Sequence, residues 1–254
     1  MFEFQARLIS NELHSGSRVR ILRFSPISID SATFPLHQAG QYALLHFDGH
    51  MARPYSIANR ADGEILEFHV RVGDHPQTGV RSYIDRDLSV GDIVDVTGFS
   101  GGCLYQSDCN RSIALIGGGT GVAPLMAIAE AALSDNPDRD VVLFHGGRTT
   151  EDFYLHDYFL NLQNLFPRFK SYAVVSGLEK DQGVYLAGLV GDVAFRELSR
   201  THDLKSMRFY ASGPVEMVRH VHDLASSFLI DPEFIHTDLD SFNQFSNTEQ
   251  DKSP

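Results

Sequence analysis

Short apolar runs with alternating polar positions dominate the first hundred residues and predict β-strands. Six runs are enriched in β-branched and aromatic residues: 2–8, 19–24, 42–47, 55–58, 65–72 and 93–97. Turn-forming pairs such as Ser15-Gly16 and Asp48-Gly49 separate them. Six short strands at this spacing predict a small antiparallel barrel, interrupted by one helix over 80–88.

The pattern changes after residue 110, where strand-length apolar runs alternate with longer runs at helical spacing. The predicted strands are 113–116, 141–145, 171–175 and 208–211, and the predicted helices are 124–133, 155–165, 189–198 and 215–229. This alternation predicts a parallel sheet flanked by helices, with ligands at the carboxyl ends of the strands. We therefore expect two domains and a tail: an antiparallel six-stranded β-barrel over 2–102, an α/β parallel-sheet domain over 110–242, and a flexible polar tail over 246–254.

One strand–turn–helix stretch, residues 112–125, carries the first sign of chemistry. Four glycines within residues 117–121 follow an apolar strand and precede an alanine- and leucine-rich helical run. Glycine lets the backbone approach a ligand, and a helix start offers unpaired N–H groups, so the turn predicts a pyrophosphate site. Val122 stands where a GxGxxG motif has its third glycine, and a glycine turn without a ligand is the alternative from this motif alone. A membrane span over 113–133 is disfavoured by the glycines, Pro124 and Glu130.

Composition narrows the classes of partner. The 254 residues include 33 acidic and 21 basic side chains, a net charge of −12, which argues against nucleic acid or an anionic membrane as the main partner. The first ten residues lack an apolar core long enough for a secretory signal, so we expect a cytoplasmic protein. Cys103 and Cys109 are too few for a zinc cage or an iron–sulfur cluster, which need about four ligands; we expect free thiols and no metal.

Five motifs then follow one another in a fixed order. They are Arg53-Pro54-Tyr55-Ser56, Gly79-Val80-Arg81-Ser82, the glycines of 117–121, Gly147-Arg148 with Asp152 and Tyr154 downstream, and Ser212-Gly213-Pro214 with Met217. In this order the chain resembles the ferredoxin–NADP reductase superfamily. It most resembles the reductase components of bacterial ring-hydroxylating dioxygenases and related oxygenases, without their iron–sulfur domain. The resemblance runs over residues 4–242.

The resemblance implies that the barrel binds a flavin through Arg53, Pro54, Tyr55 and Ser56. Arg53 would pair with a flavin phosphate, Tyr55 would lie against the isoalloxazine ring, and the Ser56 hydroxyl would sit near N5 as a catalytic group. The chemistry agrees, because a guanidinium fork suits phosphate oxygens and a hydroxyl can donate or accept a hydrogen bond. An edge strand with a tolerated proline would explain Pro54 alone.

Two further segments complete the implied flavin site. His69, Val70 and Arg71 match a strand whose backbone meets the polar edge of the flavin ring. A helix start takes the flavin diphosphate in the family, and the matching residues here are Gly79, Val80, Arg81 and Ser82. Because this diphosphate segment is kept, the resemblance favours FAD over FMN.

The second domain would bind the nicotinamide nucleotide. Its implied contacts lie on two turns: Gly118, Gly119, Thr120 and Gly121 on one, and Gly213, Pro214 and Met217 on the other. Ser212 stands where the family places a cysteine near the nicotinamide C4, so it is the second implied catalytic residue. Members that prefer NADPH carry a Ser-Arg pair where this chain has Ser176-Gly177. The resemblance therefore favours NADH, with Arg148 as the residue that could still hold the phosphate of NADPH.

The carboxyl end departs from the family pattern. Asp238 matches its acidic residue, but Asp240 stands where an aromatic is expected and Phe242 comes two positions later.

The resemblance implies a flavin-dependent oxidoreductase that takes hydride from NAD(P)H onto bound FAD. It would pass single electrons to a separate ferredoxin or oxygenase iron–sulfur component, since two cysteines cannot hold a cluster. Two alternatives stay open: a reductase that uses free flavin as a substrate, and a non-catalytic module that binds flavin and nucleotide to regulate a partner.

Overall fold

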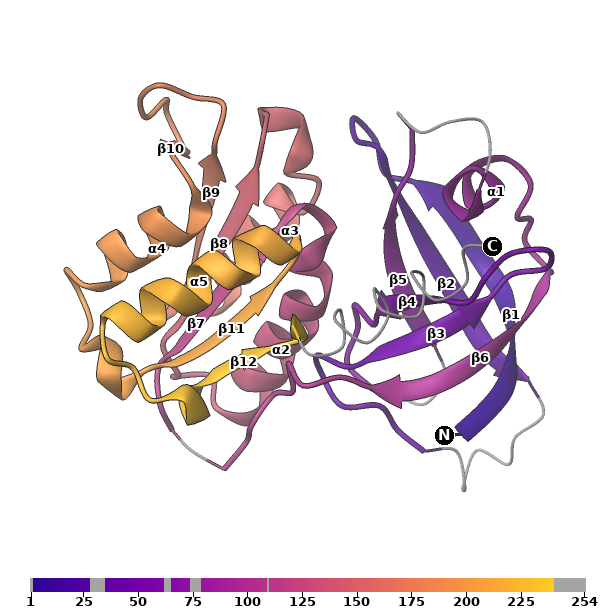
Figure 1. Ribbon diagram of the computed structural model, residues 1–254, viewed down its shortest axis with the longest axis horizontal. Coiled ribbons are helices and arrows are strands. Elements are labelled where there is room, and N and C mark those ends of the chain that lie inside the picture. The colour runs from indigo at the N-terminus through magenta and orange to yellow at the C-terminus, as the bar shows by residue number, and fades with distance from the viewer. Residues whose placement is uncertain (1, 28–34, 62–64, 74–78, 109, 240–254) are drawn as a thin grey trace, which may run out of the picture.

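The computed structural model describes residues 2–27, 35–61, 65–73, 79–108 and 110–239. Two six-stranded sheets lie side by side, one formed by the first hundred residues and the other by the residues after 112. Figure 1 shows the first sheet curling into a barrel and the second flanked by helices on both faces.

The first sheet is an antiparallel, nearly closed barrel. Its strands are β1 (Phe2–Leu13), β2 (Val19–Ile27), β3 (Tyr42–His46), β4 (Arg53–Ser56), β5 (Leu66–Arg71) and β6 (Ile93–Ser100), in the order β4-β3-β6-β1-β2-β5. An isolated antiparallel bridge between Ile57 and Phe68 joins the two ends of this order. The predicted six-stranded barrel is therefore confirmed, and helix α1 (Val80–Arg86) interrupts it as expected.

Alternation along the strands fills the barrel. On β1, Phe4, Ala6 and Leu8 are buried while the intervening side chains are exposed, because successive residues of a strand point to opposite faces. Inside, the rings of Phe24 and Phe68 meet edge to face at 6.0 Å. β1 runs five residues further than predicted because its end, through Leu13, keeps pairing with the start of β2.

The second sheet is parallel throughout. Its strands are β7 (Ile113–Gly118), β8 (Val141–Gly147), β9 (Phe169–Val175), β10 (Tyr185–Ala187), β11 (Arg208–Ser212) and β12 (Ile235–Thr237), in the order β10-β9-β8-β7-β11-β12. The four predicted strands form its centre. The sequence analysis missed β10 and β12, which are three-residue strands at the two edges and too short to carry a periodic signal.

Helices cover both faces of this sheet. They are α2 (Val122–Asp135), α3 (His156–Leu165), α4 (Val190–Leu198) and α5 (Val215–Ser227), with short 3-10 turns η1 (Gly119–Gly121), η2 (Thr150–Asp152), η3 (Leu204–Ser206) and η4 (Pro232–Phe234). The apolar side chains of α2 and α3 share one core cluster, and those of α4 and α5 share another. The predicted helices are thus all present, with ends that differ by one or two residues.

Helix α2 is buried on nearly every side because it lies between the sheet and the barrel (Figure 1). Ten of its 14 residues are buried, and its core cluster includes Val19, Ala39 and Ala58 from the barrel side. This double burial explains the apolar run that resembles a membrane span in the sequence. Within the described part of the chain, no helix is long and apolar enough to cross a membrane.

The link between the sheets is held by a carboxylate from the far end of the chain. Asp238 Oδ1 accepts hydrogen bonds from the backbone amides of Gly102 (2.7 Å) and Cys103 (3.2 Å). Burial raises the pKa of Asp238 against the opposing effect of these two bonds. Cys103 is a buried free thiol, as expected, whereas Cys109, Asp240 and Phe242 lie outside the described residues.

We predict that Asp238→Ala lowers the free energy of unfolding by about 1.5 to 3 kcal/mol, because the backbone amides of Gly102 and Cys103 lose a carboxylate acceptor. Asp238→Asn keeps an oxygen acceptor and should cost less. Urea unfolding at pH 7 measures both, with the exposed Asp138→Ala as a control within about 0.5 kcal/mol of the parent.

The pH dependence of the parent should differ from that of Asp238→Asn in a defined direction. The folded pKa of Asp238 lies above its unfolded value, so the penalty for ionising it is complete above the folded pKa and vanishes below the unfolded one. The stability of the parent should therefore gain on that of Asp238→Asn as the pH falls through this window. A parent that loses stability relative to Asp238→Asn as the pH falls would contradict the assignment.

Candidate active site

The candidate site lies where the order of the parallel sheet reverses. From β7 the chain proceeds outward to β8 and β9, then returns to place β11 on the other side of β7. The loops after β7 and β11 therefore start at adjacent strand ends and then lead to opposite faces of the sheet. Open α/β sheets bind ligands at such a place. Ser212, the last residue of β11, pairs with Gly117 of β7.

Glycines allow these two loops to touch backbone to backbone. A Cβ on Gly121 would lie 2.4 Å from Cα of Gly213, and one on Gly213 would lie 2.9 Å from the Gly118 amide nitrogen. A Cβ on Gly118 would lie 2.6 Å from Sδ of Met217 and 2.9 Å from Cδ of Pro214. The structure thus brings together the two turns that the sequence placed 90 residues apart.

Gly119 differs from the neighbouring glycines because the space around its Cβ position is open. It has a φ of 55°, and no heavy atom lies within 4 Å of the Cβ position. Residues 119–121 form the turn η1, and α2 begins directly after it at Val122, with Thr120 half-buried between them. Open space at a glycine beside a helix start suits a phosphate-bearing ligand.

A buried histidine forms a hydrogen bond with the backbone of this loop. Nε2 of His145, near the end of β8, lies 3.1 Å from the Gly119 carbonyl oxygen. Burial lowers the pKa of His145 to about 4, so at neutral pH the uncharged ring donates its Nε2–H to that carbonyl. The sequence analysis missed His145; its only signal is a polar residue ending an apolar strand.

Arg148 and Ser176 are neighbours at the ends of β8 and β9. The Ser176 amide donates to the Gly147 carbonyl at 2.9 Å, and its hydroxyl approaches the same oxygen at 3.3 Å. A Cβ on Gly177 would lie 2.6 Å from the Arg148 carbonyl oxygen. The exposed residue Arg148 and the Ser176-Gly177 pair are therefore neighbours at the carboxyl ends of β8 and β9.

On the barrel, β4 consists of the four predicted flavin residues: Arg53, Pro54, Tyr55 and Ser56. Burial raises the pKa of Tyr55 to about 12, while the positive charges of Arg81 and Arg53 oppose that shift. The charges of both arginines therefore act on the Tyr55 hydroxyl, although Arg81 comes from α1. Two arginines beside a half-buried aromatic ring form a fitting site for a flavin with phosphates.

The start of α1 contributes the remaining diphosphate residues. Gly79 precedes the helix with a φ of 92°, and no atom lies within 4 Å of its Cβ position. Val80 packs against the barrel core, Arg81 is exposed and Ser82 is half-buried. The open side of Gly79 leaves room for a phosphate beside Arg81.

The β5 residues divide between the barrel core and the second sheet. Val70 is buried in the barrel. His69 is committed on both ring nitrogens: Nε2 lies 2.9 Å from Oε1 of Glu67, and Nδ1 lies 2.8 Å from the Tyr154 hydroxyl. Arg71 donates to Asp152 at 2.8 Å. Any contact of His69 with a flavin must therefore use its backbone, in keeping with the implied role.

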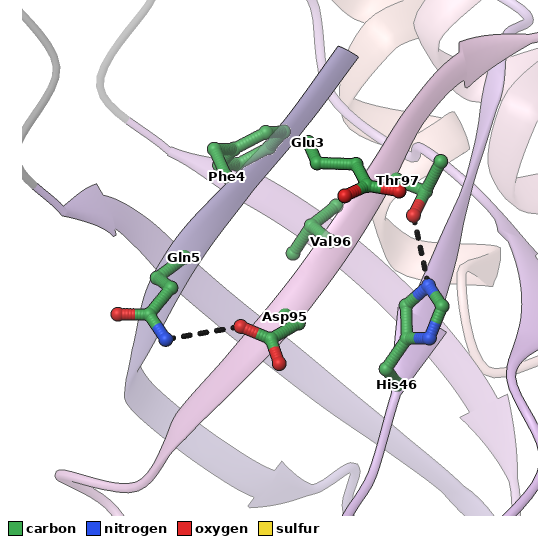
Figure 2. A pocket seen from close by; sticks show the side chains of 7 residues that line it. All are labelled: Glu3, Phe4, Gln5, His46, Asp95, Val96 and Thr97. Carbon is green, nitrogen blue, oxygen red and sulfur yellow. Dashed lines mark hydrogen bonds between the residues drawn. The ribbon is translucent and has the colours of Figure 1, made fainter. Parts of the chain in front are cut away.

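A separate hollow lies on the outer face of the barrel (Figure 2). Its lining residues are Glu3, Phe4, Gln5, His46, Asp95, Val96 and Thr97. Gln5 donates to Asp95 at 3.0 Å, and His46 shares a 2.8 Å hydrogen bond with Thr97. None of these residues belongs to the motifs above, so we do not assign the hollow to the candidate site.

Comparison with known proteins agrees with this geometry. The family described as oxidoreductase NAD-binding domain matches residues 115–223. A ferredoxin–NAD(P)+ reductase component of naphthalene dioxygenase and salicylate hydroxylase systems from Ralstonia is 30% identical over 232 residues, covering 91% of this chain and 66% of the relative. The reductase subunit of an aromatic O-demethylase from Amycolatopsis is 37% identical over 191 residues, 71% of this chain and 54% of the relative. The chain thus spans roughly half to two thirds of these relatives.

A solved structure of a reductase has the same fold. The cytochrome P450 reductase from Amycolatopsis superposes with a TM-score of 0.82 at 27% identity, over 93% of this chain and 69% of that one. The chain therefore belongs to the ferredoxin–NADP reductase superfamily, a class of NAD(P)H-dependent oxidoreductases that bind FAD and NAD(P). Within that class it is similar to reductase components of ring-hydroxylating dioxygenases. The fold class predicted from the apolar patterns and the family predicted from the motif order are both confirmed.

We predict that Arg53→Ala weakens FAD retention by a factor of about 10 to 100, since a lost charged phosphate contact costs about 1.5 to 3 kcal/mol. The FAD-to-protein ratio after gel filtration and the FAD dissociation constant measure the effect. Arg196→Ala removes an exposed arginine on α4 and should leave both unchanged. Parental FAD affinity in Arg53→Ala would contradict the assignment.

Proposed function

We propose that this protein takes hydride from a reduced nicotinamide nucleotide onto bound FAD and passes electrons singly to a separate iron–sulfur protein. The observation that carries the proposal is the contact between strand β5, which holds predicted flavin residues, and the segment after β8. That segment also carries the predicted nucleotide residue Arg148. The two cofactors would therefore be held by neighbouring segments.

The barrel residues would hold FAD. Arg53 and Arg81 supply two positive charges for phosphate oxygens, and the open side of Gly79 lets phosphate approach the start of α1. Tyr55, which stays protonated at neutral pH, offers an aromatic face. Ser56 ends β4, and its hydroxyl, which can donate or accept a hydrogen bond, would lie at the reacting edge of the flavin.

The residues at the switch point would hold the nucleotide. Gly119, next to Thr120 in the chain, borders open space after β7, and the neutral His145 fixes the Gly119 carbonyl. Ser212 is buried at the end of β11 and would lie beside the nicotinamide, where its small side chain excludes water without blocking the ring. When bound, FAD supplies the electronic chemistry, because a flavin accepts a hydride and can release electrons one at a time.

The acceptor is assigned from the relatives and the cysteine count. The Ralstonia and Pseudomonas putida relatives are named as reductase components of dioxygenase systems. This chain has only two cysteines, fewer than the four or so that a cluster requires. A ferredoxin or the iron–sulfur component of an oxygenase is therefore the proposed partner.

NADH should be oxidised with a higher kcat/KM than NADPH. The chain lacks an arginine at Gly177, where a charge-assisted bond to the 2′-phosphate would contribute about 1.5 to 3 kcal/mol. Steady-state kinetics with both nucleotides measure the preference. A strong preference for NADPH would instead assign the phosphate to Arg148 or Lys180, which Arg148→Ala and Lys180→Ala would then distinguish.

Electron delivery is the decisive test. The FAD-loaded protein is reduced by NADH in a stopped-flow instrument and then mixed with an oxidised ferredoxin from a dioxygenase system. Bleaching of the cluster absorbance in step with flavin reoxidation is expected. Transfer only to free FMN or riboflavin, with weakly held flavin, would favour the flavin-reductase alternative. If the protein binds flavin and nucleotide but neither NADH nor NADPH reduces the flavin, the regulatory-module alternative would be favoured.

A further inference from the structure

Two contacts join strand β5 of the barrel to the segment after β8. Arg71 Nη1 donates to Asp152 Oδ1 at 2.8 Å, and His69 Nδ1 lies 2.8 Å from the Tyr154 hydroxyl. Residues two apart on a strand share a face, so both β5 side chains point toward the second sheet. We call these four residues the clasp.

The two contacts of the clasp differ in exposure. His69 and Tyr154 are almost completely buried, and burial raises the pKa of Tyr154 well above its usual range, which keeps its hydroxyl protonated. Glu67 also accepts from His69 and Arg23, and although burial opposes it, these partners hold its pKa below the usual value. The His69 contact is therefore a fixed structural anchor, whereas Arg71 remains partly exposed.

Asp152 uses its two carboxylate oxygens for different segments. Oδ1 receives Arg71 of the barrel, while Oδ2 receives the backbone amides of Arg148 (2.8 Å) and Thr149 (3.2 Å). Burial opposes its ionisation, but these bonds outweigh that effect and hold the pKa of Asp152 below its usual value. The side chain is 9% exposed, and a Cβ on Gly147 would lie 2.8 Å from the Asp152 Cβ.

We propose that Asp152 is a positioning residue, which fixes the nucleotide loop at Arg148 with one oxygen and ties that loop to the flavin strand through Arg71 with the other. The inference rests on the proposed function, since it assigns Asp152 the task of setting the flavin and nicotinamide segments at a reactive separation. It goes beyond cofactor contact, because neither Asp152 nor the Arg71 side chain needs to touch a cofactor.

Such a positioning residue can affect the reaction rate because hydride transfer is sensitive to the distance between the reacting atoms. A misplacement of about 1 Å far from the reacting atoms can cost about 100-fold in rate. Arg71→Gln removes the barrel arm alone. In Asp152→Asn, the amide oxygen can keep accepting from Arg148 and Thr149, while its NH₂ group faces Arg71 and breaks the same arm. Asp152→Ala removes both arms.

The test compares these variants as FAD-loaded proteins. Single-turnover reduction by NADH should slow about tenfold in Arg71→Gln and Asp152→Asn, and the double variant should fall no further than the slower single one. The FAD content should equal that of the parent, and the NAD⁺ dissociation constant should stay within about threefold. Arg71→Lys should recover most of the rate, because an ammonium can still pair with the carboxylate.

A matched control and a second readout separate positioning from general destabilisation. Arg168→Gln breaks an ion pair with Asp140 that joins two segments of the same sheet, and it should react at the parental rate. Hydrogen–deuterium exchange should accelerate over both 66–72 and 147–155 in Arg71→Gln. Asp152→Ala should add weaker NAD⁺ binding, because the loop at Arg148 loses its anchor as well.

Three outcomes would overturn the proposal: parental rate and exchange in Arg71→Gln, loss of FAD or NAD⁺ affinity in proportion to the rate, or strictly additive effects in the double variant. If neither NADH nor NADPH reduces the parent protein, the proposed function fails. The hydrogen–deuterium exchange data then test the clasp by themselves. Faster exchange over both segments would then support the link, and unchanged exchange would reject it.

Discussion

The close approach of two loops at the sheet reversal is the constraint on which the rest of the structure depends. Gly118 and Gly121 meet Gly213 at distances that no Cβ could tolerate, so the end of β7 and the end of β11 form a single surface. That surface exists only because both strands are parallel neighbours and both loops are free of side chains there. The neutral His145 completes it by holding the Gly119 carbonyl from beneath. A nucleotide site at this place follows from topology and glycine content together.

Placing the barrel against that surface has a cost in buried polar groups. Glu130 on α2 accepts from the Tyr158 hydroxyl at 2.5 Å, and burial raises the pKa of Glu130. Burial opposes the ionisation of Glu67, but hydrogen bonds from His69 and Arg23 hold its pKa below the usual value. Buried charges are tolerated when they are paired, and they favour one geometry over others because any slip leaves them unpaired. The apolar contacts of α2 supply attraction between the sheets, and these polar pairs, with the clasp, select a particular arrangement.

The sequence by itself determined everything that depends on local pattern. Alternating apolar positions predicted the six barrel strands, helical spacing predicted the four main helices, and the order of short motifs predicted the family. Glycine clusters also located the loops, because only glycine allows such close backbone approach. The site residues were named from resemblance, and their roles stay predictions that the Arg53, nucleotide and acceptor experiments test.

Only the tertiary structure decided which distant residues meet. The edge strands β10 and β12 are three residues long, so their existence depends on neighbours and not on their own periodicity. The charge of Arg81 acts on Tyr55 from another element, the neutrality of His145 comes from its burial, and Arg71 reaches Asp152 across 81 positions of sequence. Such pairings carry no periodic signal, because burial and charge environment are properties of the packed chain. The sequence therefore names the chemistry that each segment can offer, and packing decides where it acts.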